Sequence, residues 1–216
     1  MRVWQFSSAA IVAREVTAWL IGPVVVWLLH GPQVLGREHL RALEHPFLIC
    51  PSHASHIDFS AVRLALRSRH RQRIAAAVAE DYFTVSPIRW FFAAWLGAFA
   101  FNRTGRGGHQ TIDDTLRLLD AGWSVLIFPE GTRSRTGAMA PFRPGIGLIA
   151  VRSGRQVLPV RIVGIHRVLP PGARRPHRAP VEVRFGAPLR AEPGEDARAF
   201  TARLEAAVRA LGDEAS

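Results

Sequence analysis

The sequence predicts an α/β fold: a mixed, mostly parallel sheet covered by helices on both faces, with an N-terminal apolar helical arm at the membrane interface. Three observations support this prediction. Short apolar runs alternate with amphipathic stretches of helical period along the chain. Several of these runs are apolar at every position, as in strands that are buried on both faces. An uncharged apolar segment lies near the N-terminus.

The composition fits one domain with an appended arm. The 216 residues suffice for a sizeable core, and 48% hydrophobic against 21% charged residues exclude a disordered chain. The formal charge is +11, and all 28 basic residues are Arg. Such a surface pairs with the phosphates of lipid headgroups, anionic cofactors or nucleic acid, and charge alone does not choose among them. The single Cys50 excludes an internal disulfide framework and is expected to be a buried core thiol.

Residues 1–33 are the predicted arm, and residues 34–216 are the predicted domain. The segment 16–36 has no formal charge if its histidine is neutral. Gly22-Pro23 interrupts this segment, and its apolar part would make a helix of roughly 20 Å, short of the ~30 Å hydrocarbon core of a bilayer. We therefore expect one or two helices that lie in the membrane interface, with Trp side chains at headgroup depth. A pair of buried core helices is the alternative.

The first half of the domain contains three predicted strands, at residues 47–50, 74–79 and 98–101. A helix is expected from about Ser55 to Arg69, between the first two strands. Ser86-Pro87 offers a cap and a first-turn proline, which predicts a second helix that leads into the aromatic segment 90–96.

The second half of the domain continues the alternation. Residues 111–120 have an amphipathic pattern and predict a helix that ends at Gly122. Strands are expected at residues 124–128, 157–163 and 181–185, and helices at residues 145–152 and 196–211. The stretch 170–180, rich in Pro and Arg, predicts an irregular loop.

The first candidate for chemistry is His53, followed at i+5 by Asp58. On one continuous helix these positions sit about 140° out of line. The pair can meet if His53 lies in the loop after the first strand and Asp58 in the first helical turn. Asp58 would then fix the tautomer and leave the other ring nitrogen free to take a proton. The same run is also a helix-start pattern, in which Ser55 caps the helix and Asp58 stabilises its positive end.

A second histidine, His56, offers two rival interpretations of this motif. It is a rival base, and with His53 and Asp58 it is a candidate set of metal ligands. The other histidines show no second clustered spacing. We therefore expect no metal.

The second candidate is the run Phe128-Pro129-Glu130-Gly131-Thr132-Arg133, directly after an apolar strand. A Gly-Thr-Arg turn at the end of a buried strand can hold a phosphate. A histidine base together with a phosphate clamp suggests proton removal from a hydroxyl of a phosphorylated acceptor. Glu130 is expected to hold this turn or an acceptor hydroxyl, or else to form an ion pair with a neighbouring Arg. The run Arg143-Pro144-Gly145 could support the same phosphate site.

Four blocks occur in the same order as in a known family. They are His53 to Asp58, Gly97 to Arg103, Phe128 to Ser134 and Val157 to Val160. With them the chain resembles the glycerolipid acyltransferases of the lysophosphatidic acid acyltransferase type, over roughly residues 34–190. Ser52 departs from the Asn that many members have before the histidine. The second block also departs, with Asn102 in place of an acid, and this block lines the acceptor side in the family.

The resemblance implies transfer of a fatty acyl group from acyl-CoA or acyl carrier protein to the free hydroxyl of 1-acylglycerol 3-phosphate. The residues implied are the catalytic His53 and Asp58 and the substrate-binding Arg103, Glu130, Gly131, Thr132 and Arg133. His53 would be the base, Arg103 and Arg133 would clamp the phosphate, and the turn would add backbone and hydroxyl donors. No cofactor is expected besides the co-substrate. The expected partners are the lysophospholipid, the acyl donor and the membrane surface at the cytoplasmic face, with no nucleic acid.

Two other functions stay open at this point. The acceptor could be another lysophospholipid or a lyso-aminolipid. The chain could also be a non-catalytic basic membrane-binding module, in which the His–Asp pair only caps a helix. The aromatic segment 90–96 is a core helix or, for an acyltransferase, a wall of the acyl-chain groove.

Overall fold

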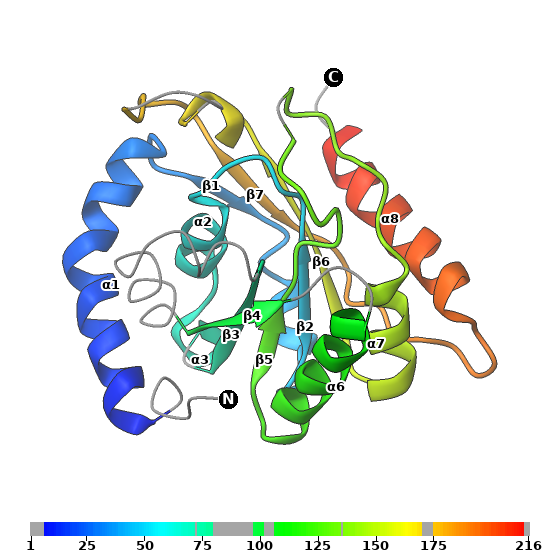
Figure 1. Cartoon of the computed structure of the whole chain (residues 1–216). Helices are drawn as coiled ribbons and strands as arrows, with labels where there is room; N and C mark the ends of the chain where they lie inside the picture. Colours follow the sequence, from blue (N-terminus) through cyan, green and yellow to red (C-terminus); the bar gives the residue numbers. More distant parts are fainter. Residues whose placement is uncertain are drawn as a thin grey trace.

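A seven-stranded sheet organises this computed structural model, which describes residues 7–71, 73–79, 97–101, 106–134, 136–169 and 175–213 (Figure 1). In sheet order the strands are β1 (Gln33–Leu35), β7 (Glu182–Phe185), β6 (Val157–Val163), β2 (Leu48–Pro51), β5 (Ser124–Leu126), β3 (Ile74–Ala79) and β4 (Ala98–Phe101). Neighbouring strands are parallel except β6 and β7, which are antiparallel. The predicted mixed, mostly parallel sheet is confirmed.

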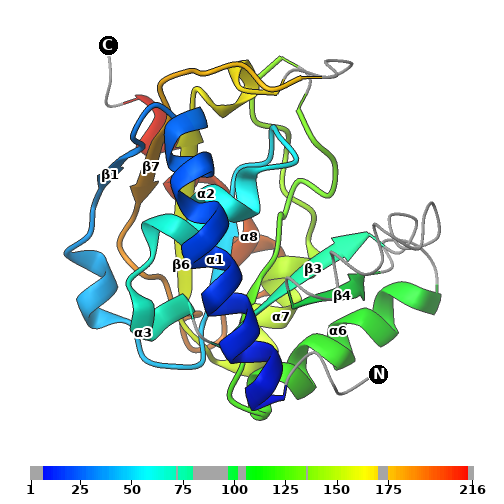
Figure 2. The ribbon, with the colours of Figure 1, turned by 90° about the vertical axis from the view of Figure 1, so that its left-hand side faces the viewer.

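Helices cover both faces of the sheet. They are α1 (Ser8–Leu28), α2 (Asp58–Ala65), α3 (Ser68–Arg71), α6 (Arg106–Asp120), α7 (Gly145–Ser153) and α8 (Ala197–Asp213), with 3₁₀ turns η2 (His39–Ala42) and η3 (Ile165–Arg167). Figures 1 and 2 show α1, α2 and α3 on one face and α6, α7 and α8 on the other. This arrangement agrees with the predicted α/β class.

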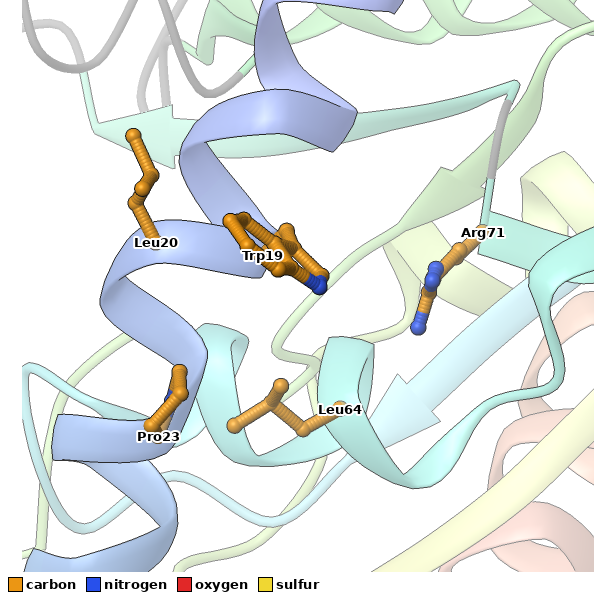
Figure 3. A pocket seen from close by; sticks show the side chains of 5 residues that line it. All are labelled: Trp19, Leu20, Pro23, Leu64 and Arg71. Atoms are coloured by element: carbon orange, nitrogen blue, oxygen red, sulfur yellow. The ribbon is translucent and has the colours of Figure 1, made fainter.

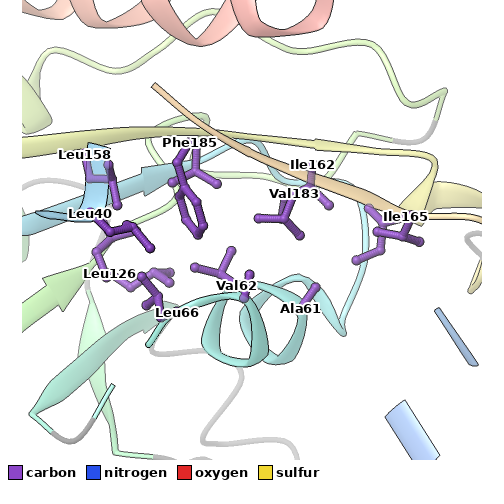
Figure 4. Packing of buried hydrophobic residues seen from close by; sticks show 14 of the residues in the cluster. Leu40, Ala61, Val62, Leu66, Leu126, Leu158, Ile162, Ile165, Val183 and Phe185 are labelled. Carbon is purple, nitrogen blue, oxygen red and sulfur yellow. The ribbon is translucent and has the colours of Figure 1, made fainter. Parts of the chain in front are cut away.

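Each face of the sheet has its own hydrophobic core. On the α2 face, Val62 and Ala61 point toward Val183 and Phe185 of the sheet (Figure 4). Along β2, Ile49 belongs to this core, whereas Cys50 belongs to the core under α6, α7 and α8. Successive strand residues point to opposite faces. This two-sided burial explains why the strand is apolar at every position. Cys50 is buried, as expected for a core thiol, and this burial raises the pKa of the thiol.

Some predicted boundaries are wrong. The helix expected over residues 55–69 is two helices, because Leu66 adopts an extended conformation (φ −72°, ψ 147°) between α2 and α3. The strand expected at 124–128 ends at Leu126, and the short edge strand β1 had not been predicted. The helix expected at 111–120 already begins at Arg106. The predicted helix that leads into the segment 90–96 lies outside the described residues.

The arm forms one bent helix that lies on the domain. Ser7 caps α1, whose Ser8–Thr17 and Gly22–Leu28 portions meet at an angle of 47° near Pro23. In the described ranges, no helix by itself has the length and apolarity to cross a bilayer, although these two portions taken together meet that test of length and composition. The division of the chain at residue 33 stays a prediction.

The two sides of α1 differ. One side packs on the domain: Arg14 is buried, and Glu15 pairs with Arg63 of α2 and Arg71 of α3, at 2.6 and 3.0 Å. The guanidinium of Arg14 also lies against Gly97, where a Cβ atom would collide with it. The other side exposes large apolar side chains: Val12, Val16, Trp19, Leu20, Val24 and Trp27. α1 is therefore neither a fully buried core helix nor a detached arm.

Candidate active site

The two sequence motifs meet where β2 and β5 end. These strands are parallel neighbours, with Leu48 opposite Val125 and Ile49 opposite Leu126. The loops that follow parallel strands emerge at the same edge of a sheet, where α/β proteins place their ligand sites. The loop after β2 contains His53, and the loop after β5 contains the Phe128–Arg133 run.

His53 and Asp58 form the predicted pair. His53 Nδ1 lies 2.8 Å from Asp58 Oδ2, and the carboxyl group, in the first residue of α2, is fully buried. The same oxygen accepts the backbone N–H groups of Ala54 and Ser55, at 2.7 and 2.9 Å. Because the carboxylate accepts, Nδ1 is assigned the proton and Nε2 keeps its lone pair. The arrangement leaves His53 Nε2 as a proton acceptor.

The helix-start interpretation of this motif needs a correction. In that alternative Ser55 caps α2, but Ile57 occupies the cap position and no side chain caps the helix, although Asp58 does lie in its first turn. Asp58 instead binds the two N–H groups of the loop that precedes it. One carboxylate therefore both orders the loop and orients the His53 ring.

Phe128 covers one face of the His53 ring. Their ring centroids are 3.9 Å apart, with 18° between the planes. The His53 side chain is 20% exposed, so solvent still reaches it. The stacking partner comes from the second motif, so the base and the Phe-Pro-Glu-Gly turn are in direct contact.

Glu130 joins the two loops. Its Oε1 accepts the N–H of His53 at 2.8 Å, and its Oε2 accepts the N–H of Ala140 at 2.9 Å. Next to this contact, the N–H of Ser134 donates to the carbonyl of His53 at 2.8 Å. Burial raises the pKa of Glu130, while the two backbone donors oppose that rise. Of the three roles considered for Glu130, holding the turn is the one that these contacts support.

Two arginines, Arg143 and Arg133, lie at the turn itself. Gly131 has φ +72°, and a Cβ atom there would lie 2.6 Å from Arg143 Nε, so only glycine fits. Arg143 therefore lies directly over the turn. Thr132 and Arg133 are exposed beside it. The guanidinium of Arg133 donates from NH1 to Nε2 of His56.

Two further predictions concern Arg103 and the alternative metal site. Arg103 lies outside the described residues, so its phosphate contact stays a prediction. The part of the chain that the structure describes has no group of three His, Cys, Asp or Glu placed to hold a metal ion. His56, the rival ligand, faces Arg133.

A family model for acyltransferases matches residues 31–163 of this chain. The chain belongs to the acyltransferase family. The match spans β1 to β6 and includes both loops of the site.

Individual acyltransferases are similar over much of this chain. A chloroplastic 1-acyl-sn-glycerol-3-phosphate acyltransferase of Brassica napus is 25% identical over 72% of this chain and 44% of its own length. A 1-acyl-sn-glycerol-3-phosphate acyltransferase of Chlamydomonas reinhardtii is 29% identical over 64% of this chain and 40% of its own length. The chain thus spans less than half of these two relatives.

A solved acyltransferase has the same fold. The crystal structure of the 1-acyl-sn-glycerophosphate acyltransferase PlsC from Thermotoga maritima superposes with a TM-score of 0.68, covering 84% of this chain and 72% of that one, at 21% identity. At this identity the likeness concerns the fold.

Besides the contacts of Glu130 and Ser134 with His53, sequence reasoning missed three contacts of the candidate site. They are the stacking of Phe128 on His53, the bond between Arg133 and His56, and the bond from the N–H of Ile162 to Ser52 Oγ, at 3.0 Å. The last contact ties the start of the His53 loop to β6. Each one joins residues far apart in sequence, so the spacing of motifs gives no sign of it.

Proposed function

We propose that the chain transfers a fatty acyl group from an acyl thioester to the free hydroxyl of 1-acylglycerol 3-phosphate, which yields phosphatidic acid. The observation behind this proposal is the His53–Asp58 pair in contact with the Phe-Pro-Glu-Gly turn. The plant and algal relatives are named 1-acyl-sn-glycerol-3-phosphate acyltransferases, which supports the same acceptor.

In the proposed reaction, His53 Nε2 takes the proton of the acceptor hydroxyl as its oxygen attacks the thioester carbonyl carbon. The tetrahedral intermediate then collapses, the carbon–sulfur bond breaks, and the thiolate recovers the proton from the imidazolium. Asp58, hydrogen-bonded at Nδ1, stabilises the cationic ring in between. The acyl group passes directly to the acceptor. Cys50 is unsuited as a nucleophile, because it is buried and its pKa is raised.

The acceptor phosphate would bind at the Gly131–Arg133 turn. Arg133 is exposed and offers a fork of N–H donors that fits phosphate oxygens. His56 accepts from NH1 of that guanidinium and so limits its orientation. Thr132 would add a hydroxyl donor, and Arg103 would add a second guanidinium. Glu130 keeps the turn attached to the His53 loop and so fixes the distance between phosphate and base.

The remaining parts of the proposal concern donor and location. The donor is acyl-CoA or acyl carrier protein, and the chemistry described above needs no cofactor or metal. The exposed apolar side of α1 would place the protein in the interface of the cell membrane, on its cytoplasmic face, where the lysophospholipid lies.

A panel assay with the purified full chain tests this function. Labelled acyl-CoA or acyl carrier protein would be offered with 1-acylglycerol 3-phosphate, with glycerol 3-phosphate, with a lysophosphatidylcholine and with a lyso-aminolipid. We expect thiol release that rises with the concentration of 1-acylglycerol 3-phosphate, together with labelled phosphatidic acid. Preference for another acceptor would refute the acceptor assignment. Thiol release that ignores every acceptor would refute the transferase itself.

A further inference from the structure

A concave region lies between α1, α2 and α3, and no described residue of the candidate active site lines it. Its described lining consists of Trp19, Leu20 and Pro23 from α1, Leu64 from α2 and Arg71 from α3 (Figure 3). Its volume of about 490 Å³ falls in the range of about 300–1,000 Å³ that small-molecule sites occupy.

The walls of this pocket are apolar and open to the surroundings. Trp19 and Leu20 are 79% and 62% exposed, and both belong to the apolar side of α1. In Figure 3 the indole of Trp19 extends from α1 toward Arg71, and Leu64 extends from α2 toward the same space. Where α1 crosses α2, Gly22 contributes no side chain, and its Cβ position lies 3.5 Å from Leu64 Cδ2. The bend near Pro23 lies beside this crossing. The pocket therefore has an exposed hydrophobic wall, whose contact with water is unfavourable.

One end of the pocket is cationic. Arg71 donates through Nε to Glu15 at 3.0 Å, and Arg63 donates through NH2 to the other oxygen at 2.6 Å. Two guanidinium groups thus share one carboxylate, which leaves one positive charge in excess at this contact. Arg63 is buried, whereas the Arg71 side chain is 29% exposed. The excess charge is therefore accessible from the pocket at Arg71.

We propose that this pocket binds one anionic glycerophospholipid of the surrounding bilayer, with an acyl chain between Trp19 and Leu64 and the phosphate at Arg71. A purely apolar ligand would leave the excess positive charge of the Arg63–Glu15–Arg71 group unbalanced, and a soluble anion would leave the apolar wall uncovered. An amphipathic anion satisfies both. The pocket also adjoins the exposed apolar side of α1, so a lipid can enter it from an interface to which that side attaches.

A binding titration tests this proposal without any turnover. The purified full chain in detergent would be titrated with phosphatidylglycerol, phosphatidic acid or phosphatidylcholine, and bound lipid would be counted by native mass spectrometry. We expect one phosphatidylglycerol per chain, bound more tightly than phosphatidylcholine. Phosphatidic acid, the product of the proposed reaction, shows whether the pocket binds a bulk bilayer lipid or the reaction product. Its preferential binding over phosphatidylglycerol would overturn the assignment to bulk bilayer lipid.

Two variants and a control locate the bound lipid. Arg71→Gln should weaken phosphatidylglycerol binding about fivefold, as expected for one basic residue near a lipid phosphate. Arg67→Gln removes the same charge from an exposed arginine that does not line the pocket, and should leave binding unchanged. Leu64→Trp narrows the pocket beside Gly22 without changing the charge and should weaken the one-to-one complex. Circular dichroism and thermal unfolding would verify that each variant is folded.

Several results would overturn the proposal. Equal binding of phosphatidylglycerol by wild type, Arg71→Gln and Leu64→Trp would place any lipid elsewhere. Equal affinity for phosphatidylcholine would remove the role of the cation. Retention of no lipid at any concentration would refute binding at this pocket. Because none of these readouts involves acyl transfer, they stand apart from the outcome of the acceptor panel.

Discussion

Two histidine groups lie at opposite ends of the same strands, β2 and β5, and only one is arranged for proton transfer. At the end where the strands finish, His53 has a buried carboxylate on Nδ1 and is accessible to solvent. At the end where they begin, His45 lies between Ser124 and His70, with ring-nitrogen distances of 3.0 and 3.1 Å. The first group has an anion that can stabilise an imidazolium. The second group has none of its own among these contacts.

The contacts of the second group fix its tautomers. Arg69 Nε donates to His70 Nε2 at 3.0 Å, so His70 carries its proton on Nδ1 and donates to His45 Nε2. His45 then donates from Nδ1 to Ser124 Oγ, which also accepts the N–H of Phe47. If either ring took a second proton, its accepting nitrogen, Nε2, would become a donor that faces another donor. A chain of hydrogen-bonded histidines is therefore structural here, whereas a single histidine with a carboxylate can act as a base.

The largest expected effect comes from replacing the ring at each end. His53→Ala should lower kcat for acyl transfer on the order of 10²–10⁴, because the hydroxyl loses its proton acceptor. His45→Ala, at the other end of β2, should leave kcat within about twofold and lower stability only. Steady-state kinetics with the preferred acceptor measures both. Similar losses in the two variants would contradict the contrast drawn above.

The next effect concerns the turn beside His53. Arg133→Ala should raise the KM for the phosphorylated acceptor about tenfold with little change in kcat, because one charge-assisted contact to phosphate is lost. His56→Ala should produce a smaller rise in the same KM, since it only positions the guanidinium. Arg67→Ala, an exposed arginine on another part of the surface, is the matched control. An unchanged KM in Arg133→Ala would argue against the phosphate clamp.

Glu130 gives a third test, of stability as well as activity. Glu130→Gln keeps the shape but turns one oxygen into a donor that faces a backbone N–H, of His53 or of Ala140. We expect a loss of about 1–3 kcal/mol in the free energy of unfolding, measured by urea denaturation. Glu44→Gln, an exposed side chain, should leave that free energy nearly unchanged. Equal stability of both variants would show that Glu130 does not hold the two loops together.

The last test concerns a pH dependence of stability from the structural histidines. Burial, with Arg69 and other nearby charges, lowers the pKa of His70 to about 4 and also lowers that of His45. Between about pH 4 and 6.5 the unfolded chain therefore binds protons that folded His70 does not. This contribution to stability is complete above pH 6.5 and is lost as the pH falls, by at most about 1.4 kcal/mol per pH unit for one proton. Urea denaturation of His70→Gln should show a flatter slope in this window, and an identical slope would contradict the assignment.

The features that could be predicted from the sequence depend on residues that lie close together along the chain. The His53–Asp58 pair was predictable because both residues lie in one short loop whose geometry is limited. The alternation of strands and helices was predictable because two-sided burial makes strands such as β2 apolar throughout. The break between α2 and α3 was not, since Leu66 is a good helix former in an unusual place.

Contacts across long stretches of chain escaped prediction. Glu130 reaches His53, and Ser124 reaches His45, only after β2 and β5 have paired. The role of Glu130 was one of three interpretations, and the histidine group at the start of the strands was not predicted at all. Both depend on which loops become neighbours, which the spacing of residues in one sequence does not encode.

The packing of α1 has a practical consequence for anyone who seeks a shorter, more soluble fragment. Cutting the chain after residue 30 would remove Glu15 and so deprive Arg63 and Arg71 of the carboxylate that they share. It would also strip the guanidinium of Arg14 from Gly97, the first residue of the block that leads to Arg103. Truncation at this point would therefore remove contacts of the domain itself and not only an exposed apolar helix face.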